Sequence, residues 1–377
     1  MDKVKRIGID MRMAGDGFGL GRYIVELAKA LLKRKSEFEY VLFFDKNFNE
    51  STFRTFQKFH NQNKLVNAKY YTLEEQIKMP GILRKEKLDL VHFPNFNTPI
   101  LYTGKIVVTI HDLIHHRFPG KKRRNFLHRL SYRYIIKQAV RNADKIIAVS
   151  QSTKDDIINL LDVESKKIEV VYEGIADNFT GEVDIARRTA TLQKYNITKP
   201  YILAVSEWRR YKNLDFLIRA FLGSGDEILE KYNLVVCGKI DPNYPEVGRT
   251  LDQANKDRVI AVGKVPEQDL VDLYSGARCF VSPSLVEGFG LTYLEAQGNQ
   301  LPILASDIPV ANEILGNSAF FFNPRDIKDL ISKLNRLLSN EDLRADLIAK
   351  GRVNLQRFSW EITARQTEEI YRNILSQ

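Results

Sequence analysis

The sequence predicts an α/β protein with two doubly wound domains, each built on a parallel sheet that helices cover on both faces. Short apolar runs alternate with longer amphipathic segments along the whole of the 377 residues. Continuous apolar strands of this kind are typical of parallel sheets buried on both faces. Twelve such runs exceed what one open sheet holds comfortably, and a length of roughly 150 residues per domain also favours two domains.

The apolar runs fall into two groups along the chain. The first group is 6–10, 40–44, 90–93, 105–111, 145–150 and 168–172, and the second is 201–206, 233–238, 259–263, 279–284, 302–306 and 319–322. Between the groups, residues 176–200 are polar and have no strand pattern, so we place the domains at 1–178 and 195–358. The last segment, 359–377, has an amphipathic helical stripe and no strand after it. We expect this helix to pack back on the first domain.

The composition indicates a globular protein of a reducing compartment. The chain is 44% apolar and 28% charged, and no apolar run approaches the ~20 residues of a membrane span. Its first residues, MDKVKRIGIDMRM, have no signal-peptide core. Cys237 and Cys279 each lie in an apolar strand-like run, without the spacing of a disulfide or a zinc site. We therefore expect buried thiols in a cytoplasmic protein.

The net charge of +10 predicts an anionic partner, and much of the excess lies in residues 121–141. This segment opens with four basic residues and continues with apolar and basic residues near helical spacing. The basic set is Lys121, Lys122, Arg123, Arg124, Arg129, Arg133 and Lys137, and the apolar set is Phe126, Leu127, Leu130, Tyr134 and Ile135. The pattern fits an amphipathic basic helix at an anionic membrane surface. A helix packed on the core, with a solvated basic side, also fits it.

A basic nucleic-acid-binding protein is a rival interpretation of the same charge. The basic residues, however, do not alternate with exposed aromatic residues in a recognisable RNA or DNA module. We therefore expect no nucleic-acid partner.

Ligands of open parallel sheets bind beyond the carboxyl ends of the strands, so the segments that follow the strands carry the candidate site residues. After the first strand, Gly15, Gly17, Gly19 and Gly21 form a loop before an amphipathic helix. Glycine lets backbone amides approach an anion at a helix N-terminus, although a surface loop without a ligand fits as well. The spacing G-x-G-x-G-x-G is not the dinucleotide fingerprint, which disfavours an oxidoreductase.

His111 and Asp112 stand at the end of the predicted strand 105–111, in the sequence VTIHDL. A histidine at this place can donate a hydrogen bond to a ligand oxygen or shuttle a proton, although a lone histidine is more often structural. His115 and His116 follow closely, but no carboxylate–histidine metal motif surrounds them. We therefore expect no metal site.

Cations follow the predicted strand 201–206. Arg209, Arg210 and Lys212 stand just ahead of a helix with an apolar face. Cations in front of a helix N-terminus, at the carboxyl end of a strand, make an anion site. Solvated loop charges are the alternative.

Two carboxylates, Glu287 and Glu295, follow the predicted strand 279–284. We expect a helix to begin near Thr292, with the amides from Gly290 to Tyr293 unpaired and partly positive. Thr292 and Glu295 also fit a capping box, in which Glu295 would only close the helix end. Glu287 has no such structural explanation. A carboxylate can accept hydrogen bonds from a pair of sugar hydroxyl groups, and cations and helix amides can hold phosphates. Together these groups predict a sugar-nucleotide site.

Glu287-GFGLTYL-Glu295 resembles the E-x7-E motif of the family 4 retaining glycosyltransferases, which have the GT-B fold of two Rossmann-like domains facing a central cleft. GFGLGRYIVELAKAL, VTIHDL, IIAVSQSTKDDI and VVYEGI look like landmarks of the amino-terminal domain. RRYKNLDFLIRAF and VPEQDLVDLYSGARCFVSPSLVEGFG look like landmarks of the nucleotide domain. The resemblance spans nearly the whole chain.

The resemblance implies a role for each candidate residue on the nucleotide side. Glu295 would bind the ribose hydroxyls, and Glu287 would lie beside the donor sugar. Backbone groups around the helix start would contact the sugar and the diphosphate; they belong to Phe289, Gly290, Leu291 and Thr292. Relatives tend to have proline where this chain has Thr292, which strengthens the capping-box alternative without excluding ribose binding by Glu295.

The remaining roles concern the phosphates and the sugar. Lys212 and one arginine would neutralise the departing diphosphate. Many relatives have Gly-Arg where this chain has Ser206-Glu207, so the choice between Arg209 and Arg210 stays open. His111 would reach the sugar from the other domain. The loop with Gly19 and Gly21 would close over the phosphates.

The resemblance also implies the reaction. Family members retain the anomeric configuration and usually need no metal, and the absence of a D-x-D triplet agrees with this. The GLGRY loop resembles the mannosyltransferase-like group 1 branch, so the expected donor is GDP-mannose, with a UDP-sugar as the alternative. No cofactor is expected besides the nucleotide sugar. The acceptor would be a glycan or a lipid-linked glycan in surface-polysaccharide or glycolipid assembly.

Overall fold

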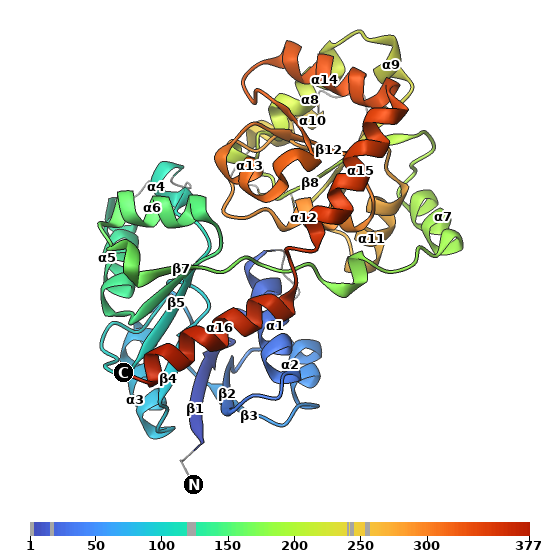
Figure 1. Ribbon diagram of the computed structural model, residues 1–377. Helices are drawn as coiled ribbons and strands as arrows, with labels where there is room; N and C mark the ends of the chain where they lie inside the picture. Colours follow the sequence, from blue (N-terminus) through green and yellow to red (C-terminus); the bar gives the residue numbers. More distant parts are fainter. Residues whose placement is uncertain (1–3, 16–18, 119–125, 240, 242–244, 253–256) are drawn as a thin grey trace. The chain divides into compact units, whose positions relative to one another are not determined.

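A computed structural model describes residues 4–15, 19–118, 126–239, 241, 245–252 and 257–377. The chain divides into two compact units. Unit 1 comprises Met1–Gly174 and Ser359–Gln377, and unit 2 comprises Ile175–Phe358. Each unit is a parallel sheet with helices on its faces, so the predicted α/β class with two doubly wound domains is confirmed (Figure 1).

Unit 1 is built on a seven-stranded sheet in the order β3-β2-β1-β4-β5-β6-β7. Its strands are β1 (Lys5–Asp10), β2 (Phe38–Asp45), β3 (Gln62–Val66), β4 (Leu90–Phe93), β5 (Ile106–Ile110), β6 (Lys145–Ala148) and β7 (Ile168–Val170). Strand β3 was missed from the sequence QNKLV. It pairs only with β2 at the edge of the sheet and stays partly exposed, so it needs no continuous apolar run.

The helices of unit 1 cover the two faces of this sheet. They are α1 (Leu20–Lys33), α2 (Glu50–Phe56), α3 (Leu73–Lys85), α4 (Ile114–Arg117), α5 (Phe126–Asn142), α6 (Gln151–Leu161) and α16 (Trp360–Leu375). One face carries α3, α5 and α6, which bury Met79, Ile136 and Ile157 against the sheet. On the other face α16 packs beside α1, so the last helix of the chain returns to unit 1 (Figure 1).

Unit 2 is built on a six-stranded sheet in the order β10-β9-β8-β11-β12-β13. Its strands are β8 (Tyr201–Val205), β9 (Asn233–Cys237), β10 (Val259–Gly263), β11 (Cys279–Ser282), β12 (Ile303–Ser306) and β13 (Phe320–Phe322). The helices are α7 (Ile185–Lys194), α8 (Leu214–Gly223), α9 (Glu227–Glu230), α10 (Pro245–Asp252), α11 (Glu267–Gly276), α12 (Leu291–Gly298), α13 (Pro309–Leu315), α14 (Ile327–Ser339) and α15 (Glu341–Leu355).

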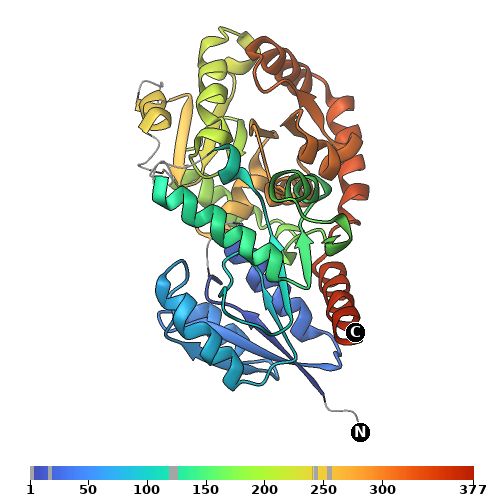
Figure 2. The ribbon, with the colours of Figure 1, turned by 90° about the vertical axis from the view of Figure 1, so that its left-hand side faces the viewer.

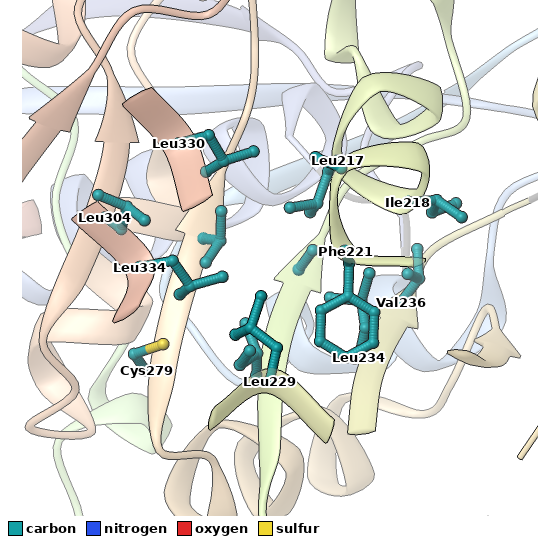
Figure 3. Close-up of a cluster of buried hydrophobic side chains, with 14 of the residues drawn as sticks. Leu217, Ile218, Phe221, Leu229, Leu234, Val236, Cys279, Leu304, Leu330 and Leu334 are labelled. Carbon is teal, nitrogen blue, oxygen red and sulfur yellow. The ribbon is translucent and has the colours of Figure 1, made fainter. Parts of the chain in front are cut away.

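One face of the unit 2 sheet packs against α8 and α14 in a closed apolar core. Leu217 and Phe221 stand one turn apart on α8, and Leu330 and Leu334 one turn apart on α14, all fully buried (Figure 3). They meet Leu234 of β9 and neighbouring strand residues. This i, i+4 spacing places two side chains of each helix on the same face, which is why the amphipathic pattern predicted helices here.

The boundary between the units falls after Gly174, a few residues before the limit at 178 that the sequence suggested. The polar stretch contains α7, which belongs to unit 2 because it packs on α11. Arg187 donates to the buried carboxylate of Asp272 at 2.9 Å, and Lys194 donates to Asp269 at 2.6 Å. Helix α7 is amphipathic but strongly charged, so no apolar run in the sequence indicates it.

The strand order places a topological switch point in each sheet. In unit 2, β8, β9 and β10 extend to one side, whereas β11, β12 and β13 extend to the other, so the chain reverses between β8 and β11. In unit 1 the reversal lies between β1 and β4. Ligands of doubly wound sheets bind outside the carboxyl ends of the strands at such points.

Cys237 and Cys279 are free and fully buried in β9 and β11, and burial raises the pKa of each thiol to about 12. Among the helices that the structure describes, none combines the length and the apolar character that crossing a membrane requires.

Candidate functional site

Lys212 and Glu287 meet at the switch point of unit 2. After β8, the chain reaches the short 3-10 helix η4 (Arg210–Lys212), and after β11 it reaches Glu287. The Lys212 ammonium donates to Oε1 of Glu287 at 2.6 Å and to Oε2 at 2.8 Å. Ser284 donates to the same Oε1 at 2.7 Å. The structure thus brings together two residues that the sequence had proposed for one site.

The pair is shielded but accessible. The side chain of Lys212 is 18% exposed and that of Glu287 is 10% exposed. An ammonium group has three donors, and two of them face the Glu287 oxygens, which leaves one for an anionic ligand. Removing either partner would leave a largely buried charge without its counter-ion, which is costly.

Helix α12 begins at Leu291, one residue earlier than predicted, with Gly290 as its N-cap. Gly290 has φ 94°, and a Cβ at this position would lie 2.4 Å from the ring of Tyr293. No side chain caps this helix end, so the proposed capping box of Thr292 and Glu295 is wrong. The reason is local: the left-handed glycine turns the chain into the helix before Thr292, and Glu295 falls in the second turn.

Glu295 is buried and accepts a hydrogen bond from the Tyr274 hydroxyl at 2.9 Å. Tyr274 comes from α11 and packs on Phe179 and Phe280. Tyr274 therefore supports Glu295, and it was not predicted from the sequence because it sits in an ordinary amphipathic helix pattern.

Phe289, another predicted site residue, is buried with its ring edge-on to Phe358 at 5.8 Å.

The two candidate arginines differ in their surroundings. Arg209 donates to the Glu207 carboxylate at 2.7 Å, so an adjacent acid offsets part of its charge. Arg210 is exposed, and within the described part of the chain no carboxylate forms an ion pair with it. Both stand in the segment between β8 and Lys212.

The glycine loop of unit 1 leads directly into α1. Gly19 is the N-cap residue with φ 69°, which favours glycine. A Cβ on Gly21 would lie 2.9 Å from the carbonyl oxygen of Gly15, so Gly15 lies close to the start of the helix. Gly17 lies outside the described residues. The described glycines thus allow the close backbone approach that an anion site requires. The binding of phosphates by the loop at Gly19 and Gly21 stays a prediction.

His111 follows β5, and both of its ring nitrogens are engaged within unit 1. Nδ1 lies 3.2 Å from Oε1 of Glu173, and Nε2 lies 2.9 Å from the carbonyl oxygen of Pro94. The ring of Tyr23 stands edge-on at 4.5 Å between centroids. His111 is therefore held in one orientation, and its predicted contact with a donor sugar stays a prediction.

A buried ion cluster that was not predicted from the sequence lies at the switch point of unit 1. The Arg12 guanidinium donates to Asp10 at 2.7 Å and to Glu75 at 2.5 Å, and all three side chains are buried. Asn97 also donates to Glu75, at 3.0 Å. Asp10 is the last residue of β1, and Arg12 follows two residues later. Their position at the carboxyl end of a strand could have marked them as candidate site residues in the sequence.

Helix α5 exposes part of the predicted basic segment. Leu130 is 54% exposed and Tyr134 is 57% exposed, one turn apart, with Arg129, Arg133 and Lys137 exposed around them. Residues 119–125, which include the four opening cations, lie outside the described residues, as do the side chains of Phe126 and Leu127. Ile135 is partly buried beside the core residue Ile136.

Among the described residues, no group of three or more histidine, cysteine, aspartate or glutamate side chains is placed to hold a metal ion. His115 and His116 instead lie against the ring of Tyr132 in the unit 1 fold.

Two doubly wound parallel sheets are the architecture of the GT-B fold. Family comparison agrees. Residues 19–179 match the family described as Glycosyltransferase Family 4, and residues 188–354 match Glycosyl transferases group 1. The chain belongs to the family 4, group 1 glycosyltransferases.

Several curated relatives are mannosyltransferases. The chain is 30% identical over 292 residues to the serotype-specific mannosyltransferase WbdA of Escherichia coli, covering 76% of this chain and 35% of that protein. It is 31% identical to the O-antigen chain mannosyltransferase RfbU of Salmonella typhimurium, covering 61% of this chain and 60% of that protein. It is 26% identical to the O-antigen chain mannosyltransferase B of Escherichia coli, covering 94% and 96%. The chain thus spans about a third of WbdA and less than two thirds of RfbU.

Solved structures show the same fold at low identity. Sucrose-phosphate synthase from Thermosynechococcus elongatus superimposes with a TM-score of 0.80 at 19% identity, over 99% of each chain. Anabaena Alr3699/HepE in complex with UDP and glucose superimposes with a TM-score of 0.78 at 16% identity, over 98% of this chain and 100% of that chain.

Proposed function

We propose that this chain transfers a hexose from a nucleotide sugar to a glycan or lipid-linked acceptor in surface-polysaccharide or glycolipid assembly. The observation that carries the proposal is the Lys212–Glu287 contact at the switch point of unit 2, beside the start of α12. A cation, a carboxylate and the positive end of a helix at one sheet edge suit a molecule with both a diphosphate and sugar hydroxyls. The family assignment supports the same chemistry.

In this proposal Lys212 binds the diphosphate and stabilises the charge that develops on it as it departs. The helix dipole of α12 and the amides of residues 289–292 act in the same direction. Glu287 holds Lys212 in place and accepts hydrogen bonds from the donor sugar, and Glu295, braced by Tyr274, accepts from the ribose hydroxyls. Catalysis is then chiefly electrostatic, with retention of configuration and without a metal ion.

GDP-mannose is the donor that we propose first, because WbdA and RfbU are mannosyltransferases by name. A UDP-sugar is the second candidate, and the HepE complexes with UDP favour it at lower identity. The nucleic-acid alternative has no support from the matched families. A thermal-shift screen across GDP-, UDP-, ADP- and dTDP-sugars separates the donors, because a ligand that binds only the folded state raises its melting temperature.

We also propose that the enzyme works in the cytoplasm at an anionic membrane surface, with unit 1 facing the lipid. The outer face of α5 combines exposed Leu130 and Tyr134 with cations, and α3 exposes Leu73 (81%) and Ile77 (75%). Both helices cover the same face of the sheet, which is turned to the viewer in Figure 2. Apolar side chains among cations are typical of interfacial binding.

The decisive experiment is product formation from GDP-mannose with a mannose-terminated glycan or lipid-linked glycan, followed by mass spectrometry. We expect one added hexose with the wild type and no turnover by the folded fraction of the Glu287→Ala variant. Absence of hexose transfer from all four classes of nucleotide sugar, with correctly folded protein, would refute the proposed function.

A further inference from the structure

The hydrogen bonds of His111 constrain its charge. Its Nδ1 faces a carboxylate oxygen of Glu173 at 3.2 Å, and its Nε2 faces the carbonyl oxygen of Pro94 at 2.9 Å. A backbone carbonyl and an ionised carboxylate only accept hydrogen bonds, whereas a neutral imidazole has a single N–H. Both contacts are satisfied at once when the ring carries a proton on each nitrogen, as an imidazolium.

The charged groups around His111 favour this state. Burial of the ring opposes the charge, but the hydrogen bond and the charge of Glu173, the Pro94 carbonyl and the nearby Asp112 outweigh it, so the pKa of His111 is raised above its ordinary value. Tyr23 faces the ring edge-on from α1.

The other titratable neighbour, His92, is itself uncharged. Burial and the charge of His111 lower the pKa of His92 to about 3. Its ring nitrogens face the hydroxyls of Tyr371 at 2.6 Å and Thr109 at 2.8 Å, and hydroxyl groups can either donate or accept. A neutral His92 therefore fits its partners, whereas a neutral His111 does not.

The carboxylate of Glu173 is held in place by the backbone on both sides of it. The carbonyl of Tyr172 accepts a hydrogen bond from Thr363 at 2.7 Å. Gly174 lies so close to the start of α16 that a Cβ there would be 2.2 Å from the Trp360 amide nitrogen. The main chain on both sides of Glu173 is thus fixed against α16, and the buried Glu173 side chain faces His111 and not solvent.

We propose that Glu173 is a positioning residue that holds His111 as an imidazolium, so that His111 carries a fixed positive charge at the end of β5. A ring that is already doubly protonated cannot take a further proton. Because both N–H groups already donate to Glu173 and Pro94, the geometry excludes proton abstraction and leaves the positive charge as the means by which His111 acts on an anionic donor. The effect on the donor rests on the proposed function; the charge state of His111 does not.

The charge is tested on the free, full-length protein by long-range proton–nitrogen NMR with 15N-labelled histidine. The His111 signals are assigned from the spectrum of His111→Gln or, if that variant does not fold, from variants of the other histidines. We expect both ring nitrogens of His111 to be protonated at neutral pH, and His92 to be neutral. A His111 ring with one protonated nitrogen at pH 7 would overturn the proposal.

The role of Glu173 is tested with Glu173→Gln, which keeps the size of the side chain and removes its charge. We expect the titration of His111 to move to lower pH by about one unit or more, since an opposite charge at hydrogen-bonding distance shifts a pKa by that amount. Glu169→Gln is the matched control, because Glu169 lies on the same segment but is exposed and pairs with Lys145. An equal titration of His111 in Glu173→Gln and wild type would remove Glu173 from the role.

The activity arm uses the pH dependence of kcat/KM. In the wild type, kcat/KM should fall as the pH rises through the raised pKa of His111, and in Glu173→Gln the same fall should begin at lower pH, while Glu169→Gln follows the wild type. A purely structural role for Glu173 would lower activity equally at all pH values, and that outcome contradicts the proposal. If no donor is turned over at all, the proposed function fails, but the NMR result still decides the charge.

Discussion

Lys212 places its ammonium nitrogen 2.6 Å and 2.8 Å from the two carboxylate oxygens of Glu287, although the residues are 75 positions apart in the chain. The contact exists because β8 and β11, which precede them, are neighbours in the sheet. In a parallel sheet the carboxyl ends of neighbouring strands open at the same edge.

Lys212→Ala should lower kcat by at least ~10²-fold, because it removes a preorganised charge from the departing diphosphate. Glu287→Ala should abolish measurable turnover. Melting temperatures of both variants serve as the control, since an unpaired charge is also destabilising. Full activity after correction for the folded fraction, or a loss within about threefold for Lys212→Ala, would show that the pair is only structural.

Glu295→Gln should raise the KM for the donor by about 10-fold or more and leave kcat nearly unchanged, because hydrogen bonds to a charged acceptor contribute about 1.5–3 kcal/mol. Tyr274→Phe should act in the same direction, since it removes the donor that braces the carboxylate. The measurement is a donor-concentration series for each variant. A lower melting temperature with an unchanged KM would assign Glu295 to folding instead of ribose binding.

Arg210→Ala should reduce kcat/KM more than Arg209→Ala. The reason is that Glu207 already offsets part of the Arg209 charge, whereas Arg210 is exposed and available to a phosphate. The comparison is made with the double variant in parallel, which shows whether the two losses add. A larger loss in Arg209→Ala would identify Arg209 as the diphosphate ligand.

Gly290→Ala should reduce the free energy of unfolding by about 2 kcal/mol and impair donor binding, because a side chain is strained at φ 94° and overlaps the Tyr293 ring. Gly223→Ala is the matched control in the same unit: it ends α8, and its Cβ would meet nothing within 4 Å. The control should be neutral or slightly stabilising. Equal unfolding curves for the two variants would show that the helix start tolerates a side chain.

Replacing Arg129, Arg133 and Lys137 together by Gln should weaken binding to vesicles that contain anionic lipid by about 100-fold, since each cation near such a surface contributes about 1 kcal/mol. The measurement is sedimentation with anionic and with zwitterionic vesicles.

The control replaces three exposed lysines of unit 2, Lys199, Lys231 and Lys328, by Gln, which changes the net charge equally. Equal losses in the two triple variants would indicate a nonspecific charge effect. Unchanged sedimentation of the α5 variant would favour the alternative interpretation, in which α5 packs on the core and only exposes its basic side to solvent.

Some features of the site could be predicted from local pattern alone, and others could not. The apolar runs before Lys212 and Glu287 identified both strands, and the structure brings these two residues into contact after the strand ends. The helix start was misjudged because a Thr-x-x-Glu spacing does not reveal that Gly290, two residues before Thr292, adopts a left-handed conformation. Strand β3 escaped because an edge strand needs little apolar surface.

The sequence by itself determined the two doubly wound sheets and the family, and it supplied the residue types of the proposed sugar-nucleotide site. Those properties follow from periodicity and from ordered motifs, which are local along the chain. Only the tertiary structure decided the partners: Lys212 with Glu287, Tyr274 with Glu295, and Glu173 with His111. These contacts depend on which strands and helices lie side by side, and strand order is set by packing over the whole unit and not by any short stretch of residues.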